Sequence, residues 1–120
     1  MNIIELKKIS KSYKTNIGSF EILKNINFKI DKKKSIFLFG PSGCGKSTLL
    51  NIITGLDVPD KGSILYEGKT IKDNHMELLK KDIGIVFQDH YLISELNVLD
   101  NIKLKCQNIS DINEICDYFK

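Results

Sequence analysis

A run of eight residues, Gly40 to Ser47, has the residue types and spacing of a loop that binds phosphate. It matches the pattern G-x-x-x-x-G-K-S/T, and a chance match in a chain of this length is expected only about a few times in a thousand. Gly43 and Gly45 are expected to let the loop wrap closely where a Cβ would collide. Lys46 would place an ammonium against the β- and γ-phosphates of a triphosphate, and Ser47 offers a hydroxyl to Mg²⁺, which prefers oxygen ligands.

The other loop positions complete this candidate site. Thr48 is a further expected phosphate contact. Cys44 stands at a variable position of the motif, where a helix N-terminus can lower a thiol pKa, although a filler role is favoured. We therefore assign to the nucleotide-binding set Gly40, Ser42, Gly43, Cys44, Gly45, Lys46, Ser47 and Thr48.

The segments on either side of the loop are those that position a phosphate site. Ile36 to Phe39 is a short apolar run, typical of a strand buried on both faces of a parallel sheet. Leu49 to Thr54 has a helical pattern, and Gly55 stands where a C-terminal cap belongs. The order strand, glycine loop, helix is the context that supports the motif.

The remaining elements predict an α/β chain that begins with antiparallel strands. Residues 2–9 and 20–30 read as two strands joined by a connection at 14–19, and in the second Ile26, Phe28 and Ile30 alternate with polar residues. Further predicted elements are a turn at 57–62, a hairpin of 63–66 with 69–72, a helix at 75–81 capped by Asn74, a second buried strand at 83–87, a helix from 98 capped by Asn97, and an amphipathic helix at 111–119.

Composition limits the class of protein. At 120 residues, with 42% hydrophobic and 28% charged residues, the chain has room for one domain with a real core. It has no apolar run near the ~20 residues of a membrane-spanning helix and no secretory signal. Three unpaired cysteines, Cys44, Cys106 and Cys116, favour reduced thiols. We expect a soluble, cytoplasmic protein.

The net charge of +3 does not indicate a nucleic-acid partner. All 18 basic residues are lysine, and they are scattered rather than gathered in a stripe with interleaved aromatics. Arginine is the side chain best suited to forked recognition of phosphate and guanine. We therefore expect no nucleic-acid binding.

Longer stretches around the loop resemble the ATP-binding-cassette (ABC) ATPases over essentially the whole chain. The segment from Gly40 to Leu50 closely resembles the family's phosphate loop, or Walker A. Ile9 to Tyr13 resembles the adenine-stacking segment and Ile85 to Asp89 the glutamine loop. Leu92 to Asn101 resembles the segment that follows and opens the helical subdomain. Within the family, two segments are most similar to lipoprotein-release and macrolide-export subunits, Gly55-Leu56-Asp57 and Glu95 to Asn101.

The resemblance implies a fold and a set of roles. The fold would be half of a RecA-like P-loop NTPase core, with an antiparallel β part (1–34 and 57–72), core segments (35–56 and 73–91) and the start of a helical subdomain (92–120). Tyr13 would stack on adenine, and Lys46 and Gln88 would serve catalysis, with Ser47 and Gln88 near Mg²⁺. The implied cofactors are ATP and Mg²⁺.

The resemblance also implies partners and a location. Membrane-spanning transporter subunits would dock at 88–101, and two ATP-binding subunits would form a homo- or heterodimer. The location would be cytoplasmic, peripheral to the inner face of the membrane.

This sequence departs from the family pattern in ways that bear on hydrolysis. Lys33-Lys34-Ser35 stands where a glycine-containing turn is usual. No Leu-Ser-Gly-Gly-Gln signature, later Asp-Glu strand end or switch histidine occurs, since His75 and His90 come too early and Asp89 is not placed as the Mg²⁺-binding aspartate. We therefore expect a truncated cassette with negligible ATPase activity alone.

Two readings from other classes remain open. One is a non-hydrolytic nucleotide-binding or interaction module. The other is a different P-loop enzyme such as a small-molecule kinase, although such kinases clamp the phosphoryl group with arginines and this chain has none.

Overall fold

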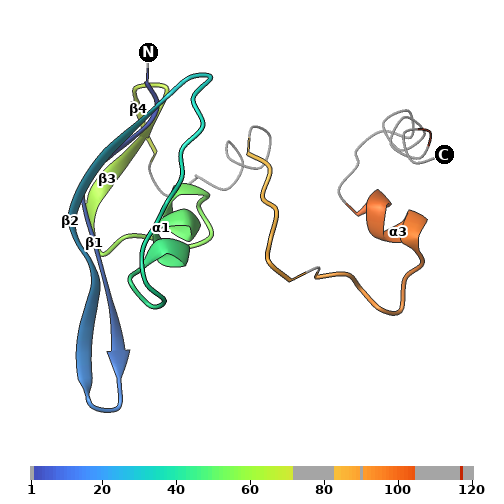
Figure 1. Cartoon of the computed structure of the whole chain (residues 1–120), viewed down its shortest axis with the longest axis horizontal. Helices are drawn as coiled ribbons and strands as arrows, with labels where there is room; N and C mark the ends of the chain where they lie inside the picture. The colour runs from blue at the N-terminus through green and yellow to red at the C-terminus, as the bar shows by residue number, and fades with distance from the viewer. Residues whose placement is uncertain (1, 72–82, 90, 105–116, 118–120) are drawn as a thin grey trace. The chain divides into compact units, whose positions relative to one another are not determined.

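Residues 2–71, 83–89, 91–104 and 117 are described by a computed structural model, in which the chain divides into two units, Met1–Ile85 and Val86–Lys120 (Figure 1). None of the helices in these ranges is long and apolar enough to cross a membrane.

A four-stranded antiparallel sheet forms most of the first unit. Its strands are β1 (Asn2–Thr15), β2 (Gly18–Asp31), β3 (Lys61–Tyr66) and β4 (Lys69–Thr70), in the order β2-β1-β3-β4 (Figure 1). Both predicted hairpins are confirmed, including the second one around Glu67 and Gly68. The predicted six-residue connection at 14–19 is wrong, because Thr15 already pairs with Gly18 and leaves only Asn16 and Ile17 in the turn.

Irregular pairing in β1 determines which of its side chains face the core. The register with β2 shifts between Leu6 and Ile9, and Lys8 between them has a φ of 52°. The Lys8 N–H donates to Asn27 Oδ1 at 3.0 Å in place of a ladder bond. Residues three apart on a regular strand point to opposite faces, whereas a bulge shifts the alternation by one residue. Leu6 and Ile9 are therefore both buried, at 1% and 0% exposure.

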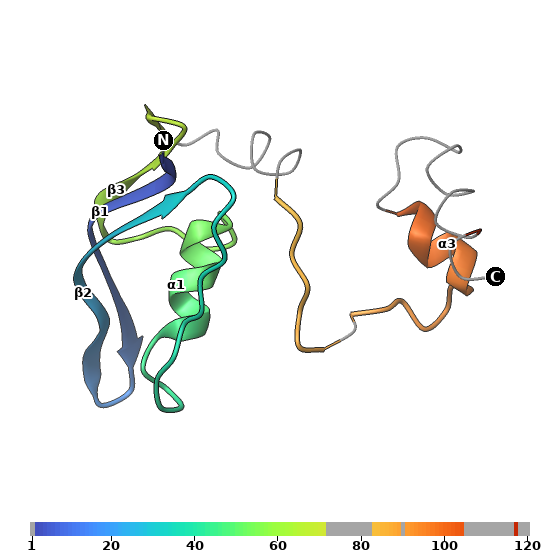
Figure 2. The same cartoon turned by 45° about the horizontal axis from the view of Figure 1, so that its top comes forward.

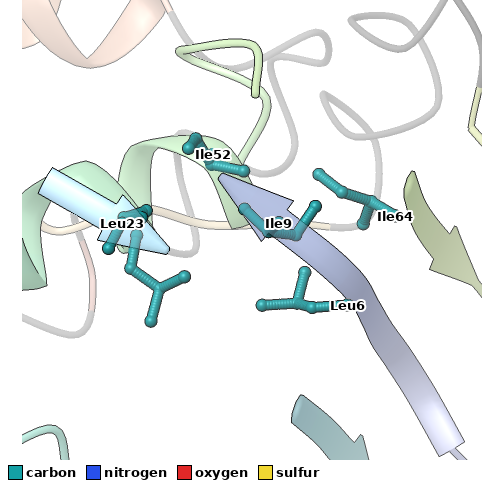
Figure 3. Close-up of a cluster of buried hydrophobic side chains, with 6 residues drawn as sticks. Leu6, Ile9, Leu23, Ile52 and Ile64 are labelled. Carbon is teal, nitrogen blue, oxygen red and sulfur yellow. The ribbon is translucent and has the colours of Figure 1, made fainter. Parts of the chain in front are cut away.

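Helix α1 (Lys46–Ile53) packs on one face of this sheet, as Figure 2 shows. The core between them combines Leu6 and Ile9 of β1, Leu23 of β2, Ile64 of β3, and Leu49 and Ile52 of α1 (Figure 3). These six side chains come from four elements, so the core joins the antiparallel strands to the helix that follows the glycine loop.

The end of α1 confirms the role predicted for Gly55. Its φ of 75° is left-handed, its N–H donates to Ile52 O at 3.3 Å, and the Leu56 N–H donates to Asn51 O at 2.8 Å. This is the Schellman pattern, in which glycine avoids the steric cost of a Cβ. The Asp57 N–H also donates to Asn51 O, at 3.1 Å, so the residue after this motif is tied to the helix end.

The two predicted buried strands are wrong for the described residues. Ile36 to Phe39 lies outside any strand, with Phe37 79% and Phe39 85% exposed, and 83–87 is likewise irregular, with Val86 99% exposed. A short apolar run favours burial, but a strand also needs a neighbouring strand to pair with its N–H and C=O groups. Neither segment has such a partner among the residues described.

In β2 the predicted alternation holds only in part. Ile26 and Ile30 are half-buried, while Phe28 is 37% exposed and the one fully buried side chain of this strand is Leu23. Leu23 lies outside the predicted period because the pairing shifts between Leu23 and Ile26, where Asn25 has a φ of 50°.

The second unit contains α3 (Val98–Lys103), whose start confirms the predicted cap. The Asn97 side chain accepts a hydrogen bond from the Asp100 N–H at 2.9 Å. Asn101 anchors the preceding loop, since its Oδ1 accepts from the Ile93 N–H at 2.9 Å and its amide donates to Ile93 O at 3.1 Å. The predicted helix at 75–81, and that at 111–119 apart from residue 117, lie outside the described residues.

Candidate functional site

The glycine loop leads directly into α1 and leaves the helix N-terminus open. Gly45 occupies the N-cap position with a φ of 97°, and no side chain caps the first turn. That turn also contains no acidic residue, and Pro41 to Cys44 are exposed. An uncapped helix N-terminus presents N–H groups and a partial positive charge, the features that hold phosphate in proteins.

The two central glycines are needed for different reasons. A Cβ on Gly45 would lie 2.9 Å from Leu23 Cδ2 and 3.2 Å from Ile22 O, so this residue must be small where the loop passes β2. A Cβ on Gly43 would meet no atom of the described residues within 4 Å, so a collision there remains a prediction for the bound phosphate. Gly43 is needed because its φ of 79° is strained for residues with a side chain.

Lys46 closes the loop on itself. Its ammonium donates to Gly40 O at 2.9 Å and to Pro41 O at 2.7 Å, and it lies 3.7 Å from Cys44 Sγ. All three groups belong to the loop, so the ammonium is held over the segment whose backbone would surround a phosphate. A phosphate oxygen is charged and the carbonyl oxygens are not, so an anion is the stronger partner for this ammonium.

The remaining loop residues offer hydroxyl groups that suit a magnesium nucleotide. Ser42 and Ser47 are exposed and Thr48 is half-buried. Ser47 stands in the first turn of α1, where its hydroxyl could serve as one oxygen ligand of Mg²⁺. Magnesium usually takes one or two protein ligands beside phosphate oxygens and water. Cys44 is exposed, and its Sγ fills the space that a Gly40 Cβ would enter, 2.6 Å away.

Tyr13 lies on β1 and is 42% exposed. Its hydroxyl donates to Asp57 Oδ2 at 2.8 Å, and the Lys11 ammonium stands 5.4 Å from the ring centroid. The ring is therefore accessible and held at its hydroxyl end. Its stacking on adenine remains a prediction.

Sequence reasoning missed the charged residues behind this ring. Lys11 donates to Asp57 Oδ1 at 2.8 Å and to Val58 O at 2.7 Å, while Asp60 Oδ2 accepts from the Ser12 N–H at 2.7 Å. Lys11 precedes Tyr13 by two residues, a spacing that could have indicated a shared strand face. Asp57 is 46 residues from Lys11 and 44 from Tyr13, so the part of the aspartates in the cluster depends on the fold.

Gln88 belongs to the second unit, in an irregular stretch between two aromatic residues. It is exposed, and the rings of Phe87 and Tyr91 contact each other edge to face with their centroids 5.0 Å apart. The predicted approach of Gln88 to Mg²⁺ stays a prediction.

A separate hollow lies on the sheet, away from the glycine loop. It has a volume of about 1080 Å³, and its lining includes the lysines of β1, β2 and β3 at positions 7, 8, 24, 29 and 61. No residue from 40 to 48 lines it. The glycine loop is thus an exposed cradle, and its backbone donors make it the candidate site.

The charge of Asp57 is stabilised by its neighbours. Burial raises the pKa of this carboxyl, but hydrogen bonds from Lys11, Tyr13 and the Val58 N–H outweigh it, so the pKa lies below its ordinary value of 3.8. The partner ammonium behaves in the complementary way. The hydrogen bond to Asp57 outweighs desolvation and raises the pKa of Lys11 above 10.5.

These pKa shifts predict an acid-sensitive contribution to stability. Because the folded-state pKa of Asp57 is lowered, its stabilising effect is complete above the unfolded value and is lost as pH falls through the folded value, below about pH 4. We expect Asp57→Asn to flatten the fall in unfolding free energy between pH 5 and about pH 2. Urea unfolding at a series of pH values measures it.

Asp31→Asn is the matched control, since Asp31 is an exposed carboxylate at the end of β2. An unchanged pH profile for Asp57→Asn would show that the Lys11–Asp57 pair does not stabilise the fold.

Comparison with known proteins relates this site to a family. The family model described as ABC transporter matches residues 23–119. An uncharacterized ABC transporter ATP-binding protein of Methanocaldococcus jannaschii is 41% identical over 106 residues, which are 85% of this chain and 47% of that protein. The lipoprotein-releasing system ATP-binding protein LolD of Wigglesworthia glossinidia brevipalpis is 38% identical over 108 residues, 87% of this chain and 47% of that protein.

A solved structure is also similar to most of this chain. A dimeric ATP-binding cassette in a post-hydrolysis state, bound to ADP and Pi, superposes with a TM-score of 0.79 at 31% identity, over 92% of this chain and 53% of that one. This likeness confirms the predicted fold class, the N-terminal part of an α/β P-loop NTPase. The chain spans about half the length of each of these proteins.

Proposed function

Because this chain belongs to the ABC transporter family of ATP-binding proteins, we propose that it binds Mg-ATP through the loop from Gly40 to Ser47. The observation that carries the proposal is the geometry of that loop. An uncapped helix N-terminus follows it, and the Lys46 ammonium is held over its backbone by Gly40 O and Pro41 O. A triphosphate supplies the concentrated negative charge that this arrangement recognises.

The binding mode has three parts in this proposal. Lys46 exchanges loop carbonyls for oxygens of the β- and γ-phosphates, and the backbone around Gly43 and Gly45 surrounds the phosphates. Ser47 supplies a hydroxyl to Mg²⁺, which neutralises charge on the phosphates when it is bound. The exposed Tyr13 ring serves as the platform for the adenine base, because stacking on an aromatic ring contributes about 1–3 kcal/mol.

The assembly belongs to the proposal as well. The similar cassette bound to ADP and Pi is a dimer, and we propose that two ATP-binding chains of this kind associate in the complete protein. Membrane-spanning transporter subunits are the proposed partners of residues 88–101, at the inner face of the membrane. In that setting Gln88 would couple the partner surface to the nucleotide.

Titration with Mg-ATP tests the proposal and yields the first prediction. Calorimetry is expected to give a dissociation constant in the range of about micromolar to millimolar. ATP is expected to bind more tightly with Mg²⁺ than in EDTA. Ser47→Ala is expected to reduce this difference in affinity by about threefold or more, because one oxygen ligand of Mg²⁺ is lost.

Ser19→Ala is the control, since Ser19 is an exposed serine at the start of β2. An absence of ATP binding at millimolar concentrations by the folded chain would contradict the proposed function. The prediction that the chain alone hydrolyses ATP negligibly is tested in parallel. Steady Mg-dependent turnover that disappears in Lys46→Ala would show it to be wrong.

A further inference from the structure

The strand that carries Tyr13 is tied to the end of α1 by a cluster of charged side chains. Asp57 is at its centre, with Oδ2 accepting from the Tyr13 hydroxyl at 2.8 Å and Oδ1 accepting from the Lys11 ammonium at 2.8 Å. The Lys11 side chain is 12% exposed and that of Asp57 28%. The bond between Lys11 and Asp57 is partly shielded from solvent, which strengthens it relative to an exposed surface pair.

Asp57 is itself fixed through both its backbone and its carboxylate. Its N–H donates to Asn51 O of α1 at 3.1 Å, and its Oδ1 accepts from the Val58 N–H at 2.7 Å. The Asp60 N–H donates to Ser10 O at 2.9 Å, so the turn that contains Asp57 and Asp60 is also hydrogen-bonded to the backbone of β1. The hydroxyl of Tyr13 is therefore bonded to a group whose position is set by the helix that begins with Lys46.

The ammonium of Lys11 adds a second constraint, on the face of the ring. It stands over the Tyr13 ring, 5.4 Å from the centroid. A cation over one face of an aromatic ring is attracted to it and occupies that side. The opposite face is then the one left for a flat ligand.

We propose that Asp57 and Lys11 are positioning residues that hold the Tyr13 ring in the orientation that receives the nucleotide base. This inference rests on the proposed function, because it assigns residues that act through the base platform. Neither side chain needs to contact the nucleotide. Asp57 restrains the hydroxyl end of the ring, and Lys11 occupies one of its faces. The ring therefore loses less conformational freedom when the base binds.

The experiment measures the binding of two probes to the full chain, Mg-ATP and magnesium tripolyphosphate. The two probes differ by the nucleoside alone. Asp57→Ala and Tyr13→Phe each remove the bond between carboxylate and hydroxyl. Each is expected to weaken Mg-ATP binding by about three- to tenfold and to leave tripolyphosphate binding within about twofold. Because Asp57→Ala already removes this bond, adding Tyr13→Phe to it should cause little further loss.

Two controls make the outcomes distinguishable. Tyr13→Ala removes the ring and is expected to abolish the preference for ATP over tripolyphosphate, and Asp31→Asn removes an exposed carboxylate on β2 and should change neither affinity. If Tyr13→Ala leaves the preference intact, the proposed base platform is wrong. If Tyr13→Ala abolishes it while Tyr13→Phe and Asp57→Ala do not, the platform stands and the positioning role is overturned.

A role confined to folding would give a different result. Loss of the folded chain weakens both probes in proportion, whereas positioning changes their ratio. Tyr13→Phe keeps the ring and opens no cavity, so it decides the question even if Asp57→Ala does not fold. An equal loss of affinity for the two probes in Tyr13→Phe would overturn the inference.

Discussion

Lys46→Ala is expected to weaken binding of Mg-ATP by about ten- to a hundredfold, because a hydrogen bond to a charged group contributes about 1.5–3 kcal/mol. Two effects act in the same direction. The substitution removes a positive charge opposite the phosphates, and it removes the ammonium that bonds Gly40 O and Pro41 O across the loop. Calorimetric titration of the purified variant with Mg-ATP measures the change.

The control separates this contact from general electrostatics. Lys34→Ala removes the same charge from an exposed position ahead of the loop, and it is expected to change affinity by less than about twofold, since salt screens exposed charges that make no contact with the ligand. Equal losses in the two variants would mean that the chain attracts ATP through its net charge rather than through the loop. The unfolding free energy of Lys46→Ala should stay near the parent value, because surface substitutions usually change it by within about 0.5 kcal/mol.

Ile52→Ala is expected to lower the unfolding free energy by about 2–5 kcal/mol, the range for truncating a fully buried aliphatic side chain. Ile52 has 0% exposure and packs with Leu6, Ile9 and Ile64 between α1 and the sheet (Figure 3). Truncation removes apolar contacts on several sides and leaves a cavity among side chains from two strands. Urea unfolding followed by circular dichroism measures it.

Ile17→Ala is a close control, since it makes the same chemical change at a residue that is 100% exposed in the turn between β1 and β2. Its effect should lie within about 0.5 kcal/mol. If both substitutions cost the same, the packing of α1 on the sheet is not the source of stability. Should Ile52→Ala also weaken ATP binding, the loss should follow the folded fraction, because Ile52 lies at the far end of the helix from Lys46.

The features that were predictable from sequence depend on residues close together in the chain. The glycine loop before α1, the cap at Asn97 and the left-handed Gly55 each follow from backbone conformations and hydrogen bonds that span a few residues. The turn at Glu67 and Gly68 belongs with them. Local steric preference is strong at such positions, so a short motif is sufficient to specify them.

The wrong predictions concern pairing and burial, which depend on distant residues. Ile36 to Phe39 and residues 83–87 have the apolar pattern of buried strands, yet the described structure gives them no ladder partner. A pattern of side chains indicates what a segment would gain by burial, but hydrogen bonds to another strand decide whether it becomes one. The burial of both Leu6 and Ile9 likewise required the bulge at Lys8, which no two-residue period predicts.

The candidate site divides along the same line. The residues that would hold phosphate and Mg²⁺ follow one another within nine positions, from Gly40 to Thr48, so the order of residues was sufficient to find them. The surroundings of Tyr13 were not visible in that order, because Lys11 and Asp57 are 46 positions apart and meet only when α1 packs on β1. Local chemistry thus predicted a phosphate-binding loop, whereas long-range packing decided what fixes the aromatic ring, since hydrophobic burial is what brings these distant polar groups within bonding distance.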